Sequence, residues 1–229
     1  TGQVLLWEIH GEEKRTIVPS ENISRYVKNA TIAIEDSSFY SHHGFSFVSF
    51  FRVIVLNALQ GKKIGSGGST ITQQLVKNTI LTNEQTIARK LKEIIIAIKL
   101  ERSYSKDEIL NLYLNEIPYG SNAYGIEAAS QSYFGKSAER VTLAESAYLA
   151  ALPNAPTYYS PYGNHRKELE QRKNLALERM KSLEFITDEE YKTAKEENVT
   201  FNPQQKQGLR APHFVMYVRE LLVEKYGED

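Results

Sequence analysis

The sequence predicts a mainly α-helical globular domain, and three observations support that fold class. Hydrophobic residues make up 41% and charged residues 24% of the 229 residues, which is an ordinary globular composition. The alternation of apolar and polar residues that is typical of strands is confined to the first 18 residues. Helix starts are marked by capping boxes, in which a hydroxyl side chain and a Glu or Gln three residues later satisfy free amides, at Thr82/Gln85, Ser105/Glu108, Thr142/Glu145 and Thr187/Glu190.

The N-terminal segment predicts a short β-hairpin. Val4–Ile9 and Arg15–Val18 are rich in strand-forming residues and flank the turn-like segment His10–Glu13. From Ser20 onward the pattern is helical, and we expect little other β-structure. Stretches that contain Gly and Pro separate the helices at 61–68, 118–122 and 153–163.

Composition and charge exclude several classes of function. The sequence has no Cys, which excludes disulfides, thiol nucleophiles, iron–sulfur clusters and thiolate zinc sites. The 28 basic and 28 acidic side chains balance, so we expect no nucleic-acid partner. Residues 61–106 nevertheless carry nine Lys or Arg against three Glu, which favours an anionic ligand there. No window of about 20 apolar residues predicts a membrane span.

The first candidate site is the segment that begins with Glu35 and Asp36 and continues to His42 and His43. An apolar run precedes the carboxylates and an aromatic run follows them, so Glu35 is expected at the edge of a buried cleft. Such a position suits a carboxyl group to general acid–base catalysis. The alternative is a helix end with exposed charges and satisfied histidines.

A second candidate is the glycine-rich segment before a helix that starts at Ser69 or Thr70. Free amides at a helix start favour an anion such as a phosphate. Thr70 and Gln74 then recur at helical spacing with Lys77 or Asn78, which places them on one face. The alternative is a flexible loop that caps an ordinary amphipathic helix, because the Gly-Lys-Ser/Thr ending of a Walker loop is missing.

The third candidate is a predicted central helix over 86–102, in which Glu93 lies near an apolar run. A buried carboxylate needs partners, and Arg89 and Lys90 lie four and three residues earlier. The helix is therefore interpreted either as a salt-bridged core helix or as a second acid beside cations that hold a negatively charged leaving group. These two interpretations are compatible.

Two further segments are assigned from their polarity. Phe45–Leu59 is mostly apolar and is followed by Lys62 and Lys63, which suits a helix lying in a membrane interface. A wholly buried helix is the alternative for this segment. The charged helix expected over His165–Ser182 is interpreted as a solvated face.

Four motifs occur in order along the chain: Glu35-Asp36-x-x-Phe39-x-x-His42-x-Gly44, Gly67-Gly68-Ser69-Thr70-x-Thr72-Gln73-Gln74-Leu75-x-Lys77-Asn78, Arg89-Lys90-x-x-Glu93-x-x-x-Ala97 and Lys106-x-x-Ile109-Leu110-x-x-Tyr113-Leu114-Asn115. Together they resemble the glycosyltransferase domain of class A penicillin-binding proteins and of monofunctional peptidoglycan glycosyltransferases. The similarity runs from Ile17 to Met180. It departs from the family at Ser66, where Gln or Glu is common.

The resemblance implies a lysozyme-like α-rich lobe with a smaller membrane-facing lobe. It also implies an enzyme that polymerises lipid II into β-1,4-linked glycan strands with inversion and release of polyprenyl pyrophosphate. Glu35 resembles the general base of the family and Glu93 its second acid. The substrate-binding residues by motif position are Asp36, Phe39, His42, Ser69, Thr70, Gln74, Lys77, Asn78, Arg89 and Lys90, and the membrane-facing ones are Phe45, Phe47, Phe50, Phe51 and Ile54.

The same resemblance sets expectations for the wider protein. Residues 1–229 are expected to form one peptidoglycan glycosyltransferase domain, with the membrane-facing lobe and a mobile loop over 45–80 and a connector toward a transpeptidase domain over 203–229. The full-length protein is expected to be held by an N-terminal transmembrane helix at the outer face of the bacterial cytoplasmic membrane. The expected partners are lipid II, the growing glycan and inhibitors of the moenomycin type, with Mg²⁺ or Mn²⁺ as cofactor.

Two other functions stay open at this point. A lysozyme-like peptidoglycan hydrolase or lytic enzyme also uses two carboxylates, but it would cut finished peptidoglycan rather than consume lipid II. A non-catalytic membrane or cell-wall scaffold would use the Phe45–Leu59 surface, and Glu35 would then be dispensable.

Overall fold

The computed structural model describes residues 14–46, 68–81, 86–204, 217, 218 and 221. The α-helices within these residues are α1 (Arg25–Glu35), α3 (Ile71–Thr79), α4 (Ile87–Ser103), α5 (Lys106–Glu116), α6 (Ile126–Phe134), α7 (Leu143–Ala151), α8 (Arg166–Ser182) and α9 (Asp188–Glu196). Short 3-10 helices η1 and η2 cover Ser20–Asn22 and Phe39–Ser41, and the strands are β1 (Lys14–Arg15), β2 (Pro118–Gly120) and β3 (Ala123–Tyr124). The predicted mainly α fold is confirmed.

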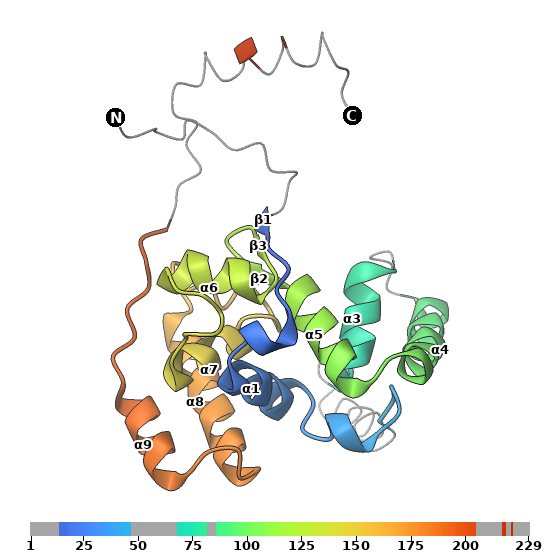
Figure 1. The fold of residues 1–229 in the computed structure, drawn as a ribbon, viewed down its shortest axis with the longest axis horizontal. Helices are drawn as coiled ribbons and strands as arrows, with labels where there is room; N and C mark the ends of the chain where they lie inside the picture. The colour runs from blue at the N-terminus through green and yellow to red at the C-terminus, as the bar shows by residue number, and fades with distance from the viewer. Residues whose placement is uncertain (1–13, 47–67, 82–85, 205–216, 219–220, 222–229) are drawn as a thin grey trace.

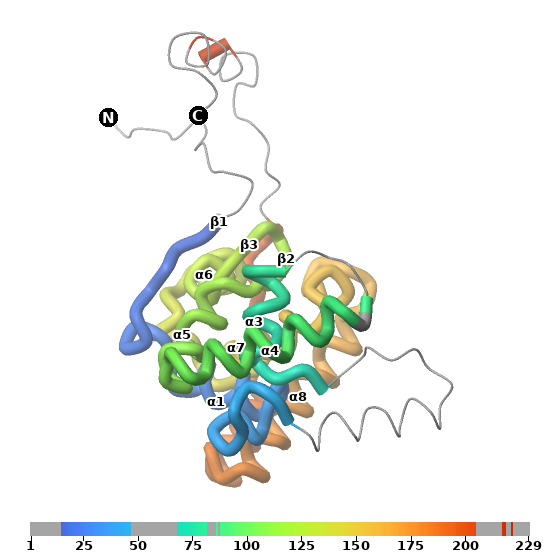
Figure 2. Tube along the Cα trace, turned by 90° about the vertical axis from the view of Figure 1, so that its right-hand side faces the viewer, coloured from blue at the N-terminus to red at the C-terminus, as the bar shows by residue number. Residues whose placement is uncertain are grey.

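The helices form two packed groups (Figure 1). In the larger group, α1, α7 and α8 pack on one another, and α6 and α9 pack at their sides. In the smaller group, α3 packs between α4 and α5. Figure 2 shows that α3 and α4 also lie side by side in the second view. The hydrophobic core runs from α1 through α7 and α8 to α5 and the first turns of α3, so the two groups share one interior.

Helix starts follow the predicted capping chemistry. The boxes at Ser105/Glu108, Thr142/Glu145 and Thr187/Glu190 are confirmed as the starts of α5, α7 and α9. A fourth box, which the sequence analysis missed, joins Thr70 and Gln73 at the start of α3. The predicted box at Thr82/Gln85 lies outside the described residues, and α4 begins after Thr86, whose side chain accepts a hydrogen bond from the Arg89 amide.

The small sheet differs from the predicted hairpin. Strand β1 pairs in parallel with β3, which pairs antiparallel with β2, while the expected partner strand Val4–Ile9 lies outside the described residues. Residues 118–122 separate α5 from α6 as predicted, and they contribute β2 and the turn into β3. The backbone turns there through positive φ angles of 85°, 51° and 59° at Gly120, Ser121 and Asn122, a conformation that Gly and Asn accept more readily than most residue types.

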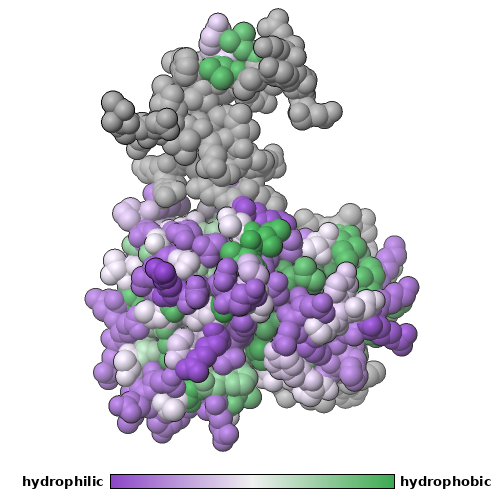
Figure 3. Space-filling view, in the orientation of Figure 1, coloured by the Kyte–Doolittle hydropathy of each residue, from purple (hydrophilic) through white to green (hydrophobic). Residues whose placement is uncertain are grey.

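The prediction that α4 is a central helix was wrong. Leu91 and Ile95 are 56% and 53% exposed, whereas Glu93 and Ala97 are buried. Of the described elements it is α3 that packs extensively on α4, so one face of the apolar run remains at the surface. In Figure 3, apolar side chains gather on the visible face near the ends of α3 and α4.

The prediction that the charged segment His165–Ser182 is a solvated face was also wrong. Leu169, Ala176, Leu177 and Met180 are fully buried on α8. Together with the buried Lys173 they recur at the spacing of three and four residues that one helix face requires. Half of the residues in this segment are charged, so the buried stripe is difficult to recognise in the sequence.

The predicted membrane-facing residues fall almost entirely outside the described residues. Phe45 is described and partly buried, whereas Phe47, Phe50, Phe51 and Ile54 lie in the 47–67 gap. Most of the predicted connector over 203–229 is likewise outside the description. Among the residues described, no helix has the length and apolar character needed to span a membrane.

Gly44 lets the segment after η2 approach α4 closely. Its φ is 82°, and a Cβ built on it would lie 2.8 Å from the Ala97 carbonyl oxygen. The Gly44 carbonyl accepts a 2.9 Å hydrogen bond from the Thr70 hydroxyl. Gly44 therefore brings the segment after α1 into contact with the start of α3 and the middle of α4.

Replacing Gly44 with Ala should lower the free energy of unfolding by about 2–4 kcal/mol, because the new methyl group adds backbone strain and a clash with backbone. Urea denaturation measures this. Gly163→Ala is the matched control, since its Cβ would meet Ser160 at 3.5 Å or more, and we expect a change below about 1 kcal/mol. Equal effects of the two substitutions would contradict the tight contact.

Candidate active site

Glu35 is the last residue of α1, and the helix delivers it to the junction of the two helix groups. The α1 helix begins at the N-cap Ser24, whose side chain accepts a hydrogen bond from the Tyr26 amide. Its buried residues, from Val27 to Ile34, pack against α7 and α8. The Glu35 side chain is 5% exposed, so its carboxylate depends on protein partners for much of its solvation.

Both carboxylate oxygens of Glu35 have a partner. Arg172 on α8 places its guanidinium nitrogen 2.6 Å from Oε1. Gln74 on α3 donates from Nε2 to Oε2 over 2.8 Å. Each oxygen keeps a further lone pair. The carboxylate is thus fixed in position while it retains the capacity to accept a proton.

Arg172 is the residue of this site that the sequence analysis missed. Its Nε donates to the Ala151 carbonyl at the end of α7 over 3.0 Å, and its guanidinium lies 5.5 Å from the centre of the Tyr159 ring. These contacts orient the guanidinium group of Arg172 toward Glu35. The signal was present in the sequence, because Arg172 lies three residues after Leu169 and four before Ala176, both of which belong to the buried stripe of α8.

Asp36 and His42 tie the end of α1 to α3 rather than facing an open cavity. Asp36 Oδ2 accepts hydrogen bonds from the Ile71 amide over 3.1 Å and lies 2.8 Å from His42 Nε2. On the other side of the imidazole, Lys106 Nζ lies 3.4 Å from Nδ1 and also 4.5 Å from the centre of the Phe39 ring. Phe39 itself is fully buried. The predicted contacts of these residues with substrate stay predictions.

Several amides at the start of α3 bind groups of the protein itself. The Thr70 amide donates to the Gln73 side chain and the Gln73 amide to the Thr70 hydroxyl. The Ile71 amide is taken by the Asp36 carboxylate. Protein groups therefore satisfy three of the amides at this helix start, and the predicted contact with an anion stays a prediction.

Glu93 is buried between two cations of its own helix, as the spacing predicted. Its side chain is 1% exposed; Arg89 donates to Oε2 over 2.9 Å, and Lys90 forms a very short contact with Oε1. Lys90 also donates to the Ser69 hydroxyl over 2.9 Å. Arg89 Nε is buried and has no hydrogen-bond partner within the described part of the chain. This cluster carries a net charge of +1.

Helix α3 links Glu35 to the Glu93 cluster. Ser69, directly before the N-cap, contacts Lys90, and Gln74 contacts Glu35. One helical turn, about 6 Å, separates the N-cap from Gln74. Lys77 and Asn78 are exposed on the last turn of α3, and their predicted contacts with sugar and phosphate stay predictions.

A resident divalent metal does not fit these side chains. Both oxygens of Glu93 face cations, and Asp36 Oδ2 is shared by an amide and an imidazole. Across the described ranges, no group of three or more His, Asp or Glu side chains is arranged to hold a metal. We therefore derive no step through a metal, and the expected Mg²⁺ or Mn²⁺ stays a prediction.

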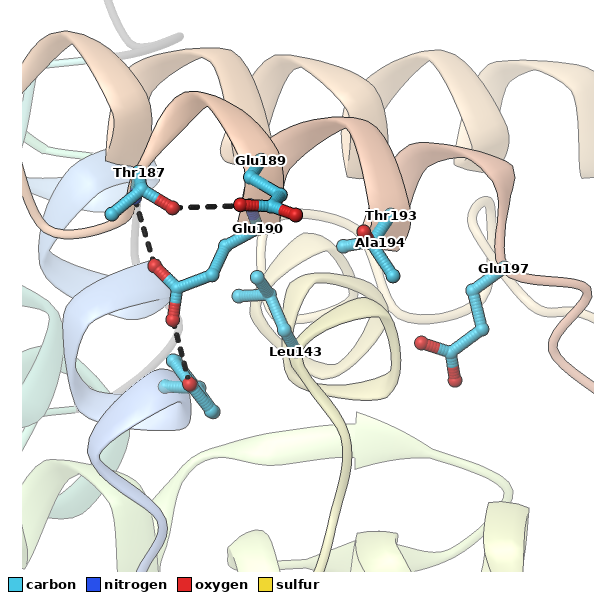
Figure 4. A pocket seen from close by; sticks show the side chains of 8 residues that line it. Leu143, Thr187, Glu189, Glu190, Thr193, Ala194 and Glu197 are labelled. Atoms are coloured by element: carbon cyan, nitrogen blue, oxygen red, sulfur yellow. Dashed lines mark hydrogen bonds between the residues drawn. The ribbon is translucent and has the colours of Figure 1, made fainter.

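A surface pocket of about 340 Å³ lies elsewhere, between α1, α7 and α9. Figure 4 shows Glu190 in it. Its carboxylate accepts hydrogen bonds from the Thr187 backbone amide and from the Tyr26 hydroxyl. Leu143 and Ala194 provide apolar surface, and Glu189 and Glu197 add further negative charge. This pocket contains none of the predicted site residues, and its acidic rim does not suit an anionic ligand.

Comparison with known proteins identifies the family. The family model described as Transglycosylase matches residues 2–181. The chain belongs to the transglycosylase family. It is 44% identical to penicillin-binding protein 1A of Aquifex aeolicus over 95% of this chain, and 43% identical to penicillin-binding protein 1F of Bacillus subtilis over 95% of this chain.

A solved relative has the same fold as this transglycosylase domain. The crystal structure of penicillin-binding protein 1A from Haemophilus influenzae matches 96% of this chain with a TM-score of 0.56 and 26% sequence identity. The chain spans 22% of that solved chain and 30% of the Aquifex and Bacillus relatives. The resemblance of the four motifs to the peptidoglycan glycosyltransferase domain is therefore confirmed, for a segment much shorter than the relatives.

The Arg172–Glu35 pair of this transglycosylase domain should couple strongly. Removing Arg172 leaves a nearly buried carboxylate unpaired, so Arg172→Met should cost about 3 kcal/mol of stability, and Glu35→Gln should recover much of that loss. A double-mutant cycle by urea denaturation should give a coupling energy of about 2 kcal/mol.

The exposed pair Arg25–Glu190 provides the matched control. Its atoms are 3.8 Å apart and its side chains are 75% and 34% exposed, so the Arg25→Met and Glu190→Gln cycle should show no measurable coupling. Additive effects of Arg172→Met and Glu35→Gln would contradict the pairing.

Proposed function

We propose that this transglycosylase domain polymerises lipid II, a disaccharide-pentapeptide on a polyprenyl pyrophosphate, with Glu35 as general base. The growing glycan is the donor, and its anomeric carbon carries the diphosphate. The 4-hydroxyl of the next lipid II attacks that carbon from the opposite face. Its proton passes to Glu35, the bond from the anomeric carbon to the diphosphate oxygen breaks, and the electron pair leaves with the diphosphate. A β-1,4 bond forms with inversion.

The observation that carries the proposal is the placement of Glu35 and of the cations of α4 on either side of the first turn of α3. Gln74 and Arg172 hold the Glu35 carboxylate in place through one hydrogen bond to each oxygen. Lys90 reaches the start of the same helix, and Arg89 beside it adds a second positive charge. In an inverting displacement the base and the leaving group lie on opposite sides of the reacting carbon, and this arrangement supplies a base and positive charge at separate places.

The pairing of both Glu93 oxygens with cations favours polymerisation over hydrolysis. A lysozyme-like hydrolase needs a second carboxyl group that faces the sugar. Glu93 is instead paired on both oxygens with Arg89 and Lys90. In our proposal Glu93 positions these two cations toward the departing diphosphate and takes no proton itself.

The proposal extends to location and partners. We infer that the domain works at the outer face of the bacterial cytoplasmic membrane, since a polyprenyl substrate is held in the bilayer. The relatives are named penicillin-binding proteins and are more than three times the length matched by this chain, which supports fusion to a transpeptidase domain in the full-length protein. Phosphoglycolipid inhibitors of the moenomycin type are expected to compete with the lipid-linked donor.

Replacing Glu35 with Gln should lower the rate of glycan formation from lipid II by about 10²-fold to 10⁴-fold, because a general base contributes that much. Gel separation of labelled glycan strands measures the rate. Glu189→Gln, an exposed change on α9, is the control and should leave polymerisation unchanged.

Undiminished polymerisation by the Glu35→Gln variant would refute the role of Glu35. Release of soluble fragments from purified cell-wall sacculi, without consumption of lipid II, would favour the hydrolase. A scaffold would keep its function in the Glu35→Gln variant and lose membrane binding when Phe47 and Phe50 are replaced by Ser.

A further inference from the structure

A chain of two hydrogen bonds leads from the proposed base into the core. Gln74 Nε2 donates to Glu35 Oε2 over 2.8 Å. The Tyr113 hydroxyl donates to Gln74 Oε1 over 3.0 Å. Gln74, Glu35 and Tyr113 lie on α3, α1 and α5, so these two hydrogen bonds join helices from both groups.

The direction of these bonds follows from the chemistry of the groups. An ionised carboxylate only accepts hydrogen bonds. The Gln74 amide must therefore turn its NH₂ group to Glu35 and its oxygen to Tyr113, and Tyr113 must donate. Tyr113 is fully buried, and burial, together with the nearby charge of Glu35, raises its pKa well above the ordinary value. Its hydroxyl hence keeps its proton at every pH at which the enzyme works.

We propose that Tyr113 is a positioning residue for the glycosyl transfer: its hydroxyl fixes the orientation of the Gln74 amide, and the amide NH₂ in turn holds the Glu35 carboxylate in place. This inference rests on the proposed role of Glu35. Tyr113 touches no reacting atom and acts through Gln74.

The consequence of losing the hydroxyl is specific. Without a donor at Oε1, the Gln74 amide is free to turn and present its oxygen to Glu35. An amide oxygen repels a carboxylate but accepts a hydrogen bond from a protonated carboxyl group. Loss of the Tyr113 hydroxyl therefore favours the protonated form, which is inactive as a base. The defect should be largest at low pH and recover at high pH.

Tyr119 provides a matched control. It is 1% exposed and lies close enough to Glu35 for that charge, after burial, to raise its pKa further. Unlike that of Tyr113, its hydroxyl has no hydrogen-bond partner among the described residues. Tyr119→Phe thus removes the same atom from an equally buried ring near the same carboxylate, without breaking a bond to Gln74.

The experiment records the rate of glycan formation from lipid II against pH for Tyr113→Phe, Tyr119→Phe, Gln74→Ala and the double variant Tyr113→Phe with Gln74→Ala. We expect the acid limb of the Tyr113→Phe profile to move to higher pH, with the maximal rate changed less than twofold. The Tyr119→Phe profile should match that of the parent chain. In the Gln74→Ala background, Tyr113→Phe should cause no further movement.

A second variant tests the same chain of bonds without altering the core. Gln74→Glu keeps an acceptor for Tyr113 but replaces the donor to Glu35 with a second carboxylate, and its acid limb should move in the same direction by more than that of Tyr113→Phe. Thermal unfolding of each variant shows whether its fold is retained at the assay temperature.

Distinct results overturn distinct claims. An unmoved Tyr113→Phe profile, or a movement that persists in the Gln74→Ala background, would overturn the positioning role of Tyr113 while leaving the proposed function intact. Polymerisation by Glu35→Gln at the parent rate would instead overturn the base itself, and the inference about Tyr113 with it.

Discussion

The site depends on how an almost fully buried carboxylate keeps its charge. Glu35 is 5% exposed, and the cost of removing such a group from water is several kcal/mol unless partners compensate. Arg172 compensates with opposite charge from one side and Gln74 with an amide donor from the other. Because these partners belong to α8 and α3, the interaction that retains the charge also fixes the larger helix group against the smaller one.

Helix α3 is the structural centre of this arrangement. Its first amide binds the Asp36 carboxylate, its N-cap hydroxyl binds the Gly44 carbonyl, and Gln74 binds Glu35. All three partners follow or end α1. The start of α3, the end of α1 and the connecting segment therefore form one polar joint. A joint built of buried hydrogen bonds is rigid, since each unmade bond leaves a buried group unsatisfied, and rigidity suits a base that must meet an incoming hydroxyl.

The pairing of Glu93 with Arg89 and Lys90 gives the second part of the site a different character. All three residues lie within one turn of α4, so this cluster forms locally, whereas the partners of Glu35 come from distant parts of the chain. A carboxylate between two cations holds them apart and orients them, and the cluster keeps a net positive charge. The proposed base is therefore held by partners from other helices, whereas the proposed cationic cluster is held within a single helix.

Local interactions explain which features could be predicted from the sequence. Three capping boxes and the Arg89–Lys90–Glu93 cluster were found because their partners lie three or four residues apart on one helix. The motif around Glu35 was found in the same way, through residue types at fixed spacing. Sequence patterns were misleading for two helices. Helix α4 is apolar enough for a core helix yet lies at the surface, and α8 is charged enough for a surface helix yet packs in the core. The packing of neighbouring helices decides which face of a helix is covered.

The sequence by itself determined the helical fold class, most helix starts, the identity of the acids at Glu35 and Glu93 and the cations beside the latter. Only the tertiary structure decided that Arg172 faces Glu35, that Asp36 binds the first amide of α3, and that the Tyr113 hydroxyl binds Gln74. The reason is physical. Each of these contacts joins residues 35 to 137 positions apart, so it depends on how separate helices pack, whereas a cap or an i,i+4 pair is set by the geometry of a single helix.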